Sequence, residues 1–236
     1  MSRTPIYLLF GLALGLMVGP AMAQNAADRT VPPPPDFDVD AQVWDNPDSP
    51  GDAAPLVPLA DIEAYLQALT DFQAQFILIG PDYRTSHGTL SLSKPGRLRF
   101  EYDPPDQLLI VSDGKTISLV DYELKQVTRW PIRKTPLRPL VRTGEVFGED
   151  VTVQSIRQYR KQIRVTIAEA GDEDEGSMEL IFTPQPLQLE GWEVIDGRGR
   201  RTIIALNDMQ TDISLEDALW TFDDPRPQRR RLPGKR

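Results

Sequence analysis

The hydrophobic positions of this chain follow a helical pattern first and an alternating pattern afterwards. Over residues 59–72 the apolar residues recur at steps of three and four, which predicts an amphipathic helix with one buried stripe. From residue 75 onward the period changes to two. Along residues 97–102 apolar side chains alternate with charged ones, so this segment is predicted to be a strand with one apolar and one charged face.

Turn residues divide the following chain into further strands. Asp113-Gly114 and Asp196-Gly197 each lie between two alternating runs, and this dipeptide favours the tight turn of a β-hairpin. Residues 135–141 interrupt the alternation with two prolines, which indicates a short helix or turn over part of the sheet. Residues 215–219 fit a single helical turn. The other strands are predicted at residues 75–79, 88–93, 107–111, 115–120, 123–130, 151–159, 162–168, 177–182, 187–195, 200–206 and 220–222.

About ten or eleven antiparallel strands with meander spacing predict a mainly β protein with a few helices. A single sheet of this size must curl or close, because its long apolar faces cannot stay in water. The predicted helices are the obvious covers for its open side. A curled sheet with helical covers encloses a space, and the pattern alone leaves open whether side chains or a ligand fill it.

The two ends of the chain differ in composition from the middle. Residues 1–23 carry one basic residue, an uncharged apolar run and a small-x-small ending, which predicts a secretory signal peptide. Residues 24–58 are rich in proline and contain seven Asp against one Arg, as expected for a disordered acidic linker. Residues 226–236 hold six basic residues and no acid, a disordered tail that would suit an anionic lipid surface.

The domain between these ends, residues 59–225, carries 18 Lys and Arg against 28 Asp and Glu, a net charge of −10. Such an acidic, exported domain is a poor partner for nucleic acid. The chain has no cysteine, which excludes thiol nucleophiles and a lipid anchor of its own. The one histidine, His87, stands without a catalytic motif, and the acidic run 172–175 lacks the spacing of a calcium loop. We therefore expect no enzyme activity, cofactor or metal.

One central segment resembles a known family. The run Leu-Ser-Leu-Ser-Lys-Pro-Gly-Arg-Leu-Arg-Phe-Glu-Tyr at residues 90–102, with Pro104, Ile-Val-Ser-Asp-Gly-Lys at 110–115 and Val-Asp-Tyr at 120–122, resembles the signature of the LolA outer-membrane lipoprotein carriers. The resemblance extends over residues 59–225. It implies an unclosed antiparallel β-barrel with a helical lid over an apolar cavity.

The resemblance also implies a role and partners. Such carriers are periplasmic, take triacylated lipoproteins from an inner-membrane ABC transporter, and pass them to an outer-membrane acceptor; we expect a monomer. Leu137, Leu140 and Val141 would form the lid. The family has an arginine just before the signature proline that ties the sheet to the lid, and here that position is Lys94, which lacks the planar fork of arginine.

The inward positions of the alternating strands are the candidate lipid-binding residues, and ordinary core packing is the alternative for each. A sensor of the same fold that binds lipid or lipoprotein to report on it is the second reading, and an exported hydrolase on a β-scaffold is the third. The candidate cavity residues are Leu90, Leu92, Leu98, Phe100, Leu109, Val111, Ile117, Leu119, Val165, Ile167, Leu180 and Phe182.

Overall fold

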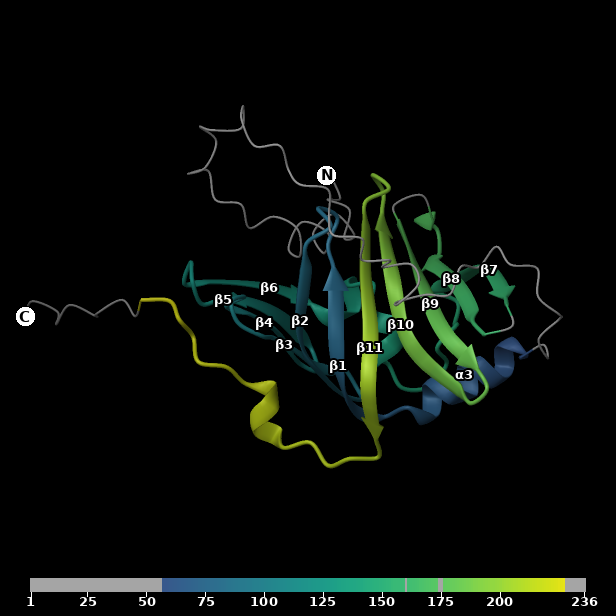
Figure 1. The fold of residues 1–236 in the computed structure, drawn as a ribbon, viewed down its shortest axis with the longest axis horizontal. Coiled ribbons are helices and arrows are strands. Elements are labelled where there is room, and N and C mark those ends of the chain that lie inside the picture. The colour runs from purple at the N-terminus through teal and green to yellow at the C-terminus, as the bar shows by residue number, and fades with distance from the viewer. Residues whose placement is uncertain (1–56, 160, 174–175, 228–236) are drawn as a thin grey trace, which may run out of the picture.

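The computed structural model describes residues 57–159, 161–173 and 176–227. They form one 11-stranded antiparallel sheet in the order β6-β5-β4-β3-β2-β1-β11-β10-β9-β8-β7. The sheet curls into an unclosed barrel whose free edges are β6 and β7 (Figure 1). The strands are β1 (Asp71–Ile79), β2 (Thr85–Ser93), β3 (Arg97–Tyr102), β4 (Leu108–Asp113), β5 (Thr116–Asp121), β6 (Gln126–Pro131), β7 (Val151–Gln158), β8 (Ile163–Glu169), β9 (Gly176–Pro184), β10 (Leu187–Asp196) and β11 (Arg201–Thr211).

The fold class predicted from the alternation is confirmed, and most strands lie within a few residues of their predicted bounds. The predicted signal peptide, residues 24–56 of the predicted linker and residues 228–236 of the predicted tail lie outside the described residues. The described helices include none that is long and apolar enough to cross a membrane.

The helix α3 (Leu59–Ala68) is shorter than the apolar spacing predicted. Its buried residues Ile62 and Leu66 face the sheet. The chain then turns into β1, so Phe72 belongs to a strand and pairs with Leu92 of β2. The prediction was wrong at this end because Phe72 would be buried in the core whether it belonged to the helix or to the strand. Apolar spacing alone does not mark where the helix stops.

Two short helical segments connect β6 to β7 and lie over the concave face of the sheet. The first is the 3-10 helix η2 (Ile132–Lys134), and the second is α4 (Arg138–Val141). Leu137, Leu140 and Val141 are buried in the main hydrophobic cluster. We call residues 132–141 the lid segment. Its position matches the cover that the two prolines of residues 135–141 predicted.

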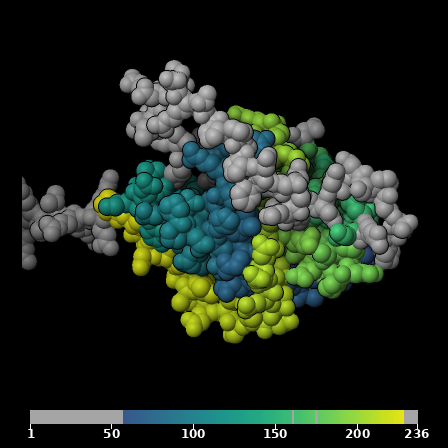
Figure 2. All heavy atoms as spheres, in the orientation of Figure 1, coloured from purple at the N-terminus to yellow at the C-terminus, as the bar shows by residue number. Residues whose placement is uncertain are grey.

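The C-terminal segment crosses the convex face of the sheet instead of adding a strand. It contains the 3-10 helix η4 (Asp217–Trp220) and continues extended to Phe222. Arg99 of β3 holds it by donating from Nη1 to the carbonyl oxygens of Leu219 and Thr221, at 3.1 and 3.2 Å. The strand predicted at residues 220–222 was therefore wrong, and Figure 2 shows this segment in yellow beside the teal strands.

Candidate functional site

The site is an apolar pocket between the concave face of the sheet and the lid segment. Strands β2 and β3 pair with Leu90 opposite Phe100 and Leu92 opposite Leu98, so all four side chains share one face. The pocket has a cavity volume of about 10 Å³. Its lining is wholly apolar apart from one indole N–H and consists of Leu90, Leu92, Leu98, Phe100, Leu137, Leu140, Val141 and Trp192.

The pocket is small for a lipid. Ligand pockets of about 300–1,000 Å³ are usual for small molecules, whereas this cavity has a volume of about 10 Å³. Leu137, Leu140 and Val141 of the lid segment close it on one side. A long acyl chain would therefore enter only if the lid segment moved away from the sheet, and the structure represents the closed arrangement.

The structure brings ten of the twelve candidate cavity residues into the main hydrophobic cluster, and four of these ten line the pocket. Ile117, Leu119, Val165, Ile167, Leu180 and Phe182 belong to the same cluster but not to the pocket lining. Leu109 and Val111 were placed on the wrong face. They pack with Val120 in a second cluster on the convex side, where Phe222 covers them.

Two pocket-side residues were missed from the sequence. Ile110 pairs with Phe100 and belongs to the main cluster, but the continuous apolar run of β4 hid its orientation. Trp192 lines the pocket from β10. The apolar positions of β10 change phase between Leu189 and Trp192, and this shift is the mark of a β-bulge that pattern analysis could have detected.

Ion pairs from the loop before β7 hold the lid segment. Asp150 contacts Arg138 at 2.5 Å and Arg142 at 2.8 Å. Burial opposes the ionisation of Asp150, but Arg142 and Arg138 outweigh it and keep the pKa of this carboxyl below its ordinary value. On the sheet side, the Gly96 N–H donates to the Val141 carbonyl oxygen at 2.7 Å.

Lys94 ties the sheet to α3 and not to the lid segment. Its Nζ donates to the Leu66 carbonyl oxygen near the end of α3, at 2.5 Å. This corrects the predicted latch. The amine reaches a helix carbonyl, but the helix is the one that precedes β1. The turn between β2 and β3 also reaches the lid segment. That contact is made by the backbone of Gly96, two residues after Lys94.

The partial burial of Lys94 predicts a pH-dependent stability. Desolvation lowers the pKa of Lys94 from 10.5 to about 8. Because the unfolded chain then binds more protons between pH 8 and 10.5, the contribution of Lys94 to the free energy of unfolding rises with pH in that window and is constant below it. Burial raises the pKa of Tyr102, which lowers stability only above about pH 10.

Between pH 7 and pH 9.5, we expect the free energy of unfolding of wild type to rise by about 1 kcal/mol relative to that of Lys94→Gln. This figure allows for solvent screening of a half-exposed amine. Urea unfolding of both proteins at the two pH values measures this difference, and Tyr102 cancels in the comparison. An unchanged difference would show that the amine is not desolvated.

The family model described as outer membrane lipoprotein carrier protein LolA matches residues 67–223. The chain belongs to the LolA family. A carrier protein of Chromohalobacter salexigens is 28% identical over 173 residues, covering 70% of this chain and 81% of that relative. One from Pseudomonas aeruginosa is 28% identical over 186 residues, covering 74% and 86%. Both are named outer-membrane lipoprotein carrier protein.

Solved structures resemble the chain as well. The crystal structure of a LolA superfamily protein from Nitrosomonas europaea aligns with a TM-score of 0.42 and 10% sequence identity. The alignment covers 71% of this chain and 99% of that chain.

A second hollow of this LolA-family chain lies where the lid segment meets the other end of the sheet. It has a cavity volume of about 30 Å³ and is lined by both apolar and charged side chains. Ile167 and Met178 supply apolar surface, whereas Arg138 and Asp150 belong to the ion pairs that hold the lid segment.

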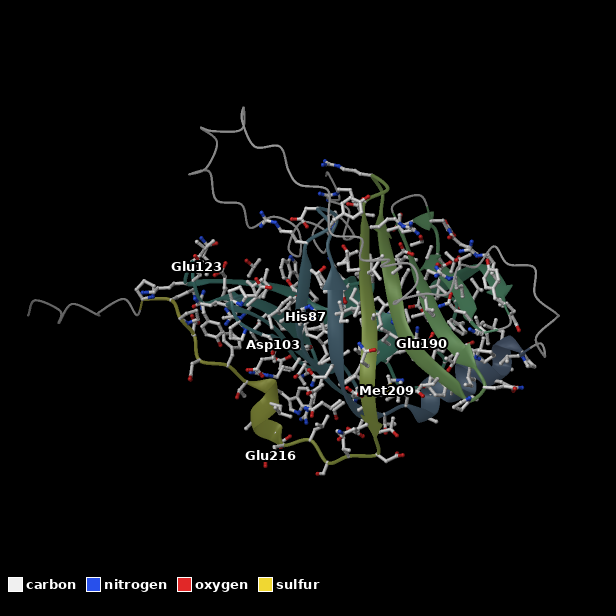
Figure 3. All side chains as sticks on the ribbon, in the orientation of Figure 1. His87, Asp103, Glu123, Glu190, Met209 and Glu216 are labelled. Carbon is white, nitrogen blue, oxygen red and sulfur yellow. The ribbon has the colours of Figure 1, made fainter. Side chains whose placement is uncertain are left out.

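Among the described residues of this LolA-family chain, no titratable side chain lines the apolar pocket. His87 is exposed on β2, where its carbonyl oxygen accepts the Asp103 N–H (Figure 3). Glu179 and Glu193 are paired neighbours on the convex face of β9 and β10. Arg164 contacts Glu179 at 2.7 Å. Within the described ranges, no His, Asp or Glu side chains gather in a group that would hold a metal ion.

Proposed function

We propose that this protein is a periplasmic carrier that shields the acyl chains of lipoproteins and moves them from the inner to the outer membrane. The observation that carries the proposal is the apolar pocket between the concave face and the lid segment. The membership of the chain in the LolA family supports the same conclusion, as do relatives that are named outer-membrane lipoprotein carrier proteins.

The energetics of acyl chains explain why a carrier of this shape is required. Each CH₂ exposed to water costs about 0.8 kcal/mol, so a lipoprotein with several chains cannot leave a membrane unshielded. Opening the lid segment would expose the apolar surface of β2 and β3 and offer it to those chains. The closed lid keeps that surface dry while no cargo is bound.

The proposed route defines the other partners. Export by the predicted signal peptide, residues 1–23, would bring the chain to the periplasm as a monomer without a cofactor. An inner-membrane ABC transporter would load it. An outer-membrane acceptor, or an anionic lipid surface contacted by the basic residues 226–236, would receive the cargo. No enzymatic step is required, because loading and release are changes of binding partner.

The sensor alternative is not favoured, since the relatives named above are called carriers. Depletion distinguishes the two roles. Loss of a carrier leaves outer-membrane lipoproteins in the inner membrane, whereas loss of a sensor leaves their sorting intact.

Site-specific photocrosslinking tests the carrier function directly. A photoreactive residue at Phe100 faces the pocket, whereas the same residue at Glu101 faces the solvent on the same strand. We expect Phe100, and likewise Leu92, to capture acylated lipoprotein in the periplasm, with at least about tenfold less capture at Glu101. Equal capture at both positions, or none at any inward position, would contradict shielding in this pocket.

A further inference from the structure

Trp192 carries the only polar atom of the pocket lining for which the described structure supplies no partner. Its side chain is 1% exposed, and its Nε1 atom has no hydrogen-bond acceptor among the described residues. A buried donor without an acceptor costs about 1–3 kcal/mol. Such donors are rare in folded proteins and require an explanation at each occurrence.

The position of the indole is fixed by its surroundings. Trp192 lies opposite Leu180 and Ile204 on the neighbouring strands. Its ring meets the ring of Phe100 edge to face, with centroids 6.3 Å apart. The other side chains of the pocket are aliphatic or phenyl groups, which contain no hydrogen-bond acceptor. The indole N–H of Trp192 is therefore the one side-chain hydrogen-bond donor that the described lining of this pocket contains.

We propose that the Trp192 indole N–H donates a hydrogen bond to an acyl carbonyl oxygen of the bound cargo. This inference rests on the proposed carrier function and adds the group of the cargo that is recognised. An ester- or amide-linked acyl chain is hydrocarbon except for the carbonyl at its head. One donor in an apolar pocket therefore fixes where the head of a chain lies, and it favours acyl chains over alkyl chains that lack the carbonyl.

The chain offers a matched control in Trp220. This residue is also buried, and its Nε1 likewise has no acceptor among the described residues. It lies in η4, within the C-terminal segment that crosses the convex face. Removing its N–H changes the same chemical group outside the pocket.

The test compares two diacyl lipopeptides that share one peptide, have no N-acyl group, and carry either two hexadecanoyl esters or two hexadecyl ethers. Their dissociation constants are measured for the full-length wild type, Trp192→Phe and Trp220→Phe. We expect wild type and Trp220→Phe to bind the ester about 3- to 10-fold more tightly than the ether. The ratio should fall to about one in Trp192→Phe, and because it is taken within each variant, changes of cavity size cancel.

An ester-to-ether ratio that is the same in Trp192→Phe and wild type would overturn the proposal while leaving the carrier function intact. Failure of wild type to bind either lipopeptide would instead contradict the proposed function. If Trp192→Phe does not fold, infrared spectra of the ¹³C-labelled ester bound to wild type decide the question. A carbonyl band shifted to lower frequency than in hydrocarbon supports the hydrogen bond, and an unshifted band rejects it.

Discussion

Replacing Gly191 with alanine is expected to lower the free energy of unfolding by about 3 kcal/mol or more, the largest loss that we predict for a single methyl group. Gly191 has a φ of +151°, a backbone conformation that favours glycine. A Cβ at this position would lie 2.1 Å from the Ile204 carbonyl oxygen on the neighbouring strand. The clash involves backbone on both sides, so side-chain rotation cannot relieve it.

Gly191 also sets the orientation of the residue that follows it. The register between β9 and β10 shifts between Leu189 and Gly191, and this bulge turns both Leu189 and Trp192 toward the core. Without the extra residue, strict alternation would direct Trp192 to the convex face. We therefore expect Gly191→Ala to disturb the pocket as well as the stability.

Gly171→Ala is the matched control for Gly191→Ala. Gly171 also has a positive φ, +84°, but a Cβ there would meet nothing within 4 Å. Its replacement should cost only the conformational strain, about 1 kcal/mol. Urea unfolding of the two variants and wild type compares these losses, and equal losses would show that the approach of Ile204 does not matter.

The sequence predicted those strands whose two faces differ in polarity. Residues 97–102 alternate apolar and charged side chains, and β3 has those bounds. In β4 the run Leu108 to Val111 is apolar at every position, because the C-terminal segment buries the convex face there as well. No local pattern tells which of these side chains faces the pocket, so the sequence predicts Leu109 and Val111 there in place of Ile110.

The candidate site was predictable only in part, since it depends on contacts between distant segments. The lid residues could be recognised from two prolines that interrupt the alternation. The partner of Lys94 could not be read from its neighbours in sequence, because Leu66 lies 28 positions earlier. Asp150 holds the lid segment from a loop that precedes β7, and nothing in its local sequence distinguishes it from the other acids of an acidic domain.

Replacing Leu140 with aspartate is expected to weaken the binding of a diacyl lipopeptide at least about 100-fold. Leu140 is buried on the lid segment and faces the pocket. An ionised carboxylate there has no partner in the apolar lining, and it can regain water when the empty lid opens but not when acyl chains pack against it. A fluorescent lipopeptide measures the affinity. Leu140→Met preserves the volume and Lys134→Asp changes charge on an exposed part of the lid segment. Both should bind nearly as wild type, whereas unchanged binding by Leu140→Asp would place the acyl chains elsewhere.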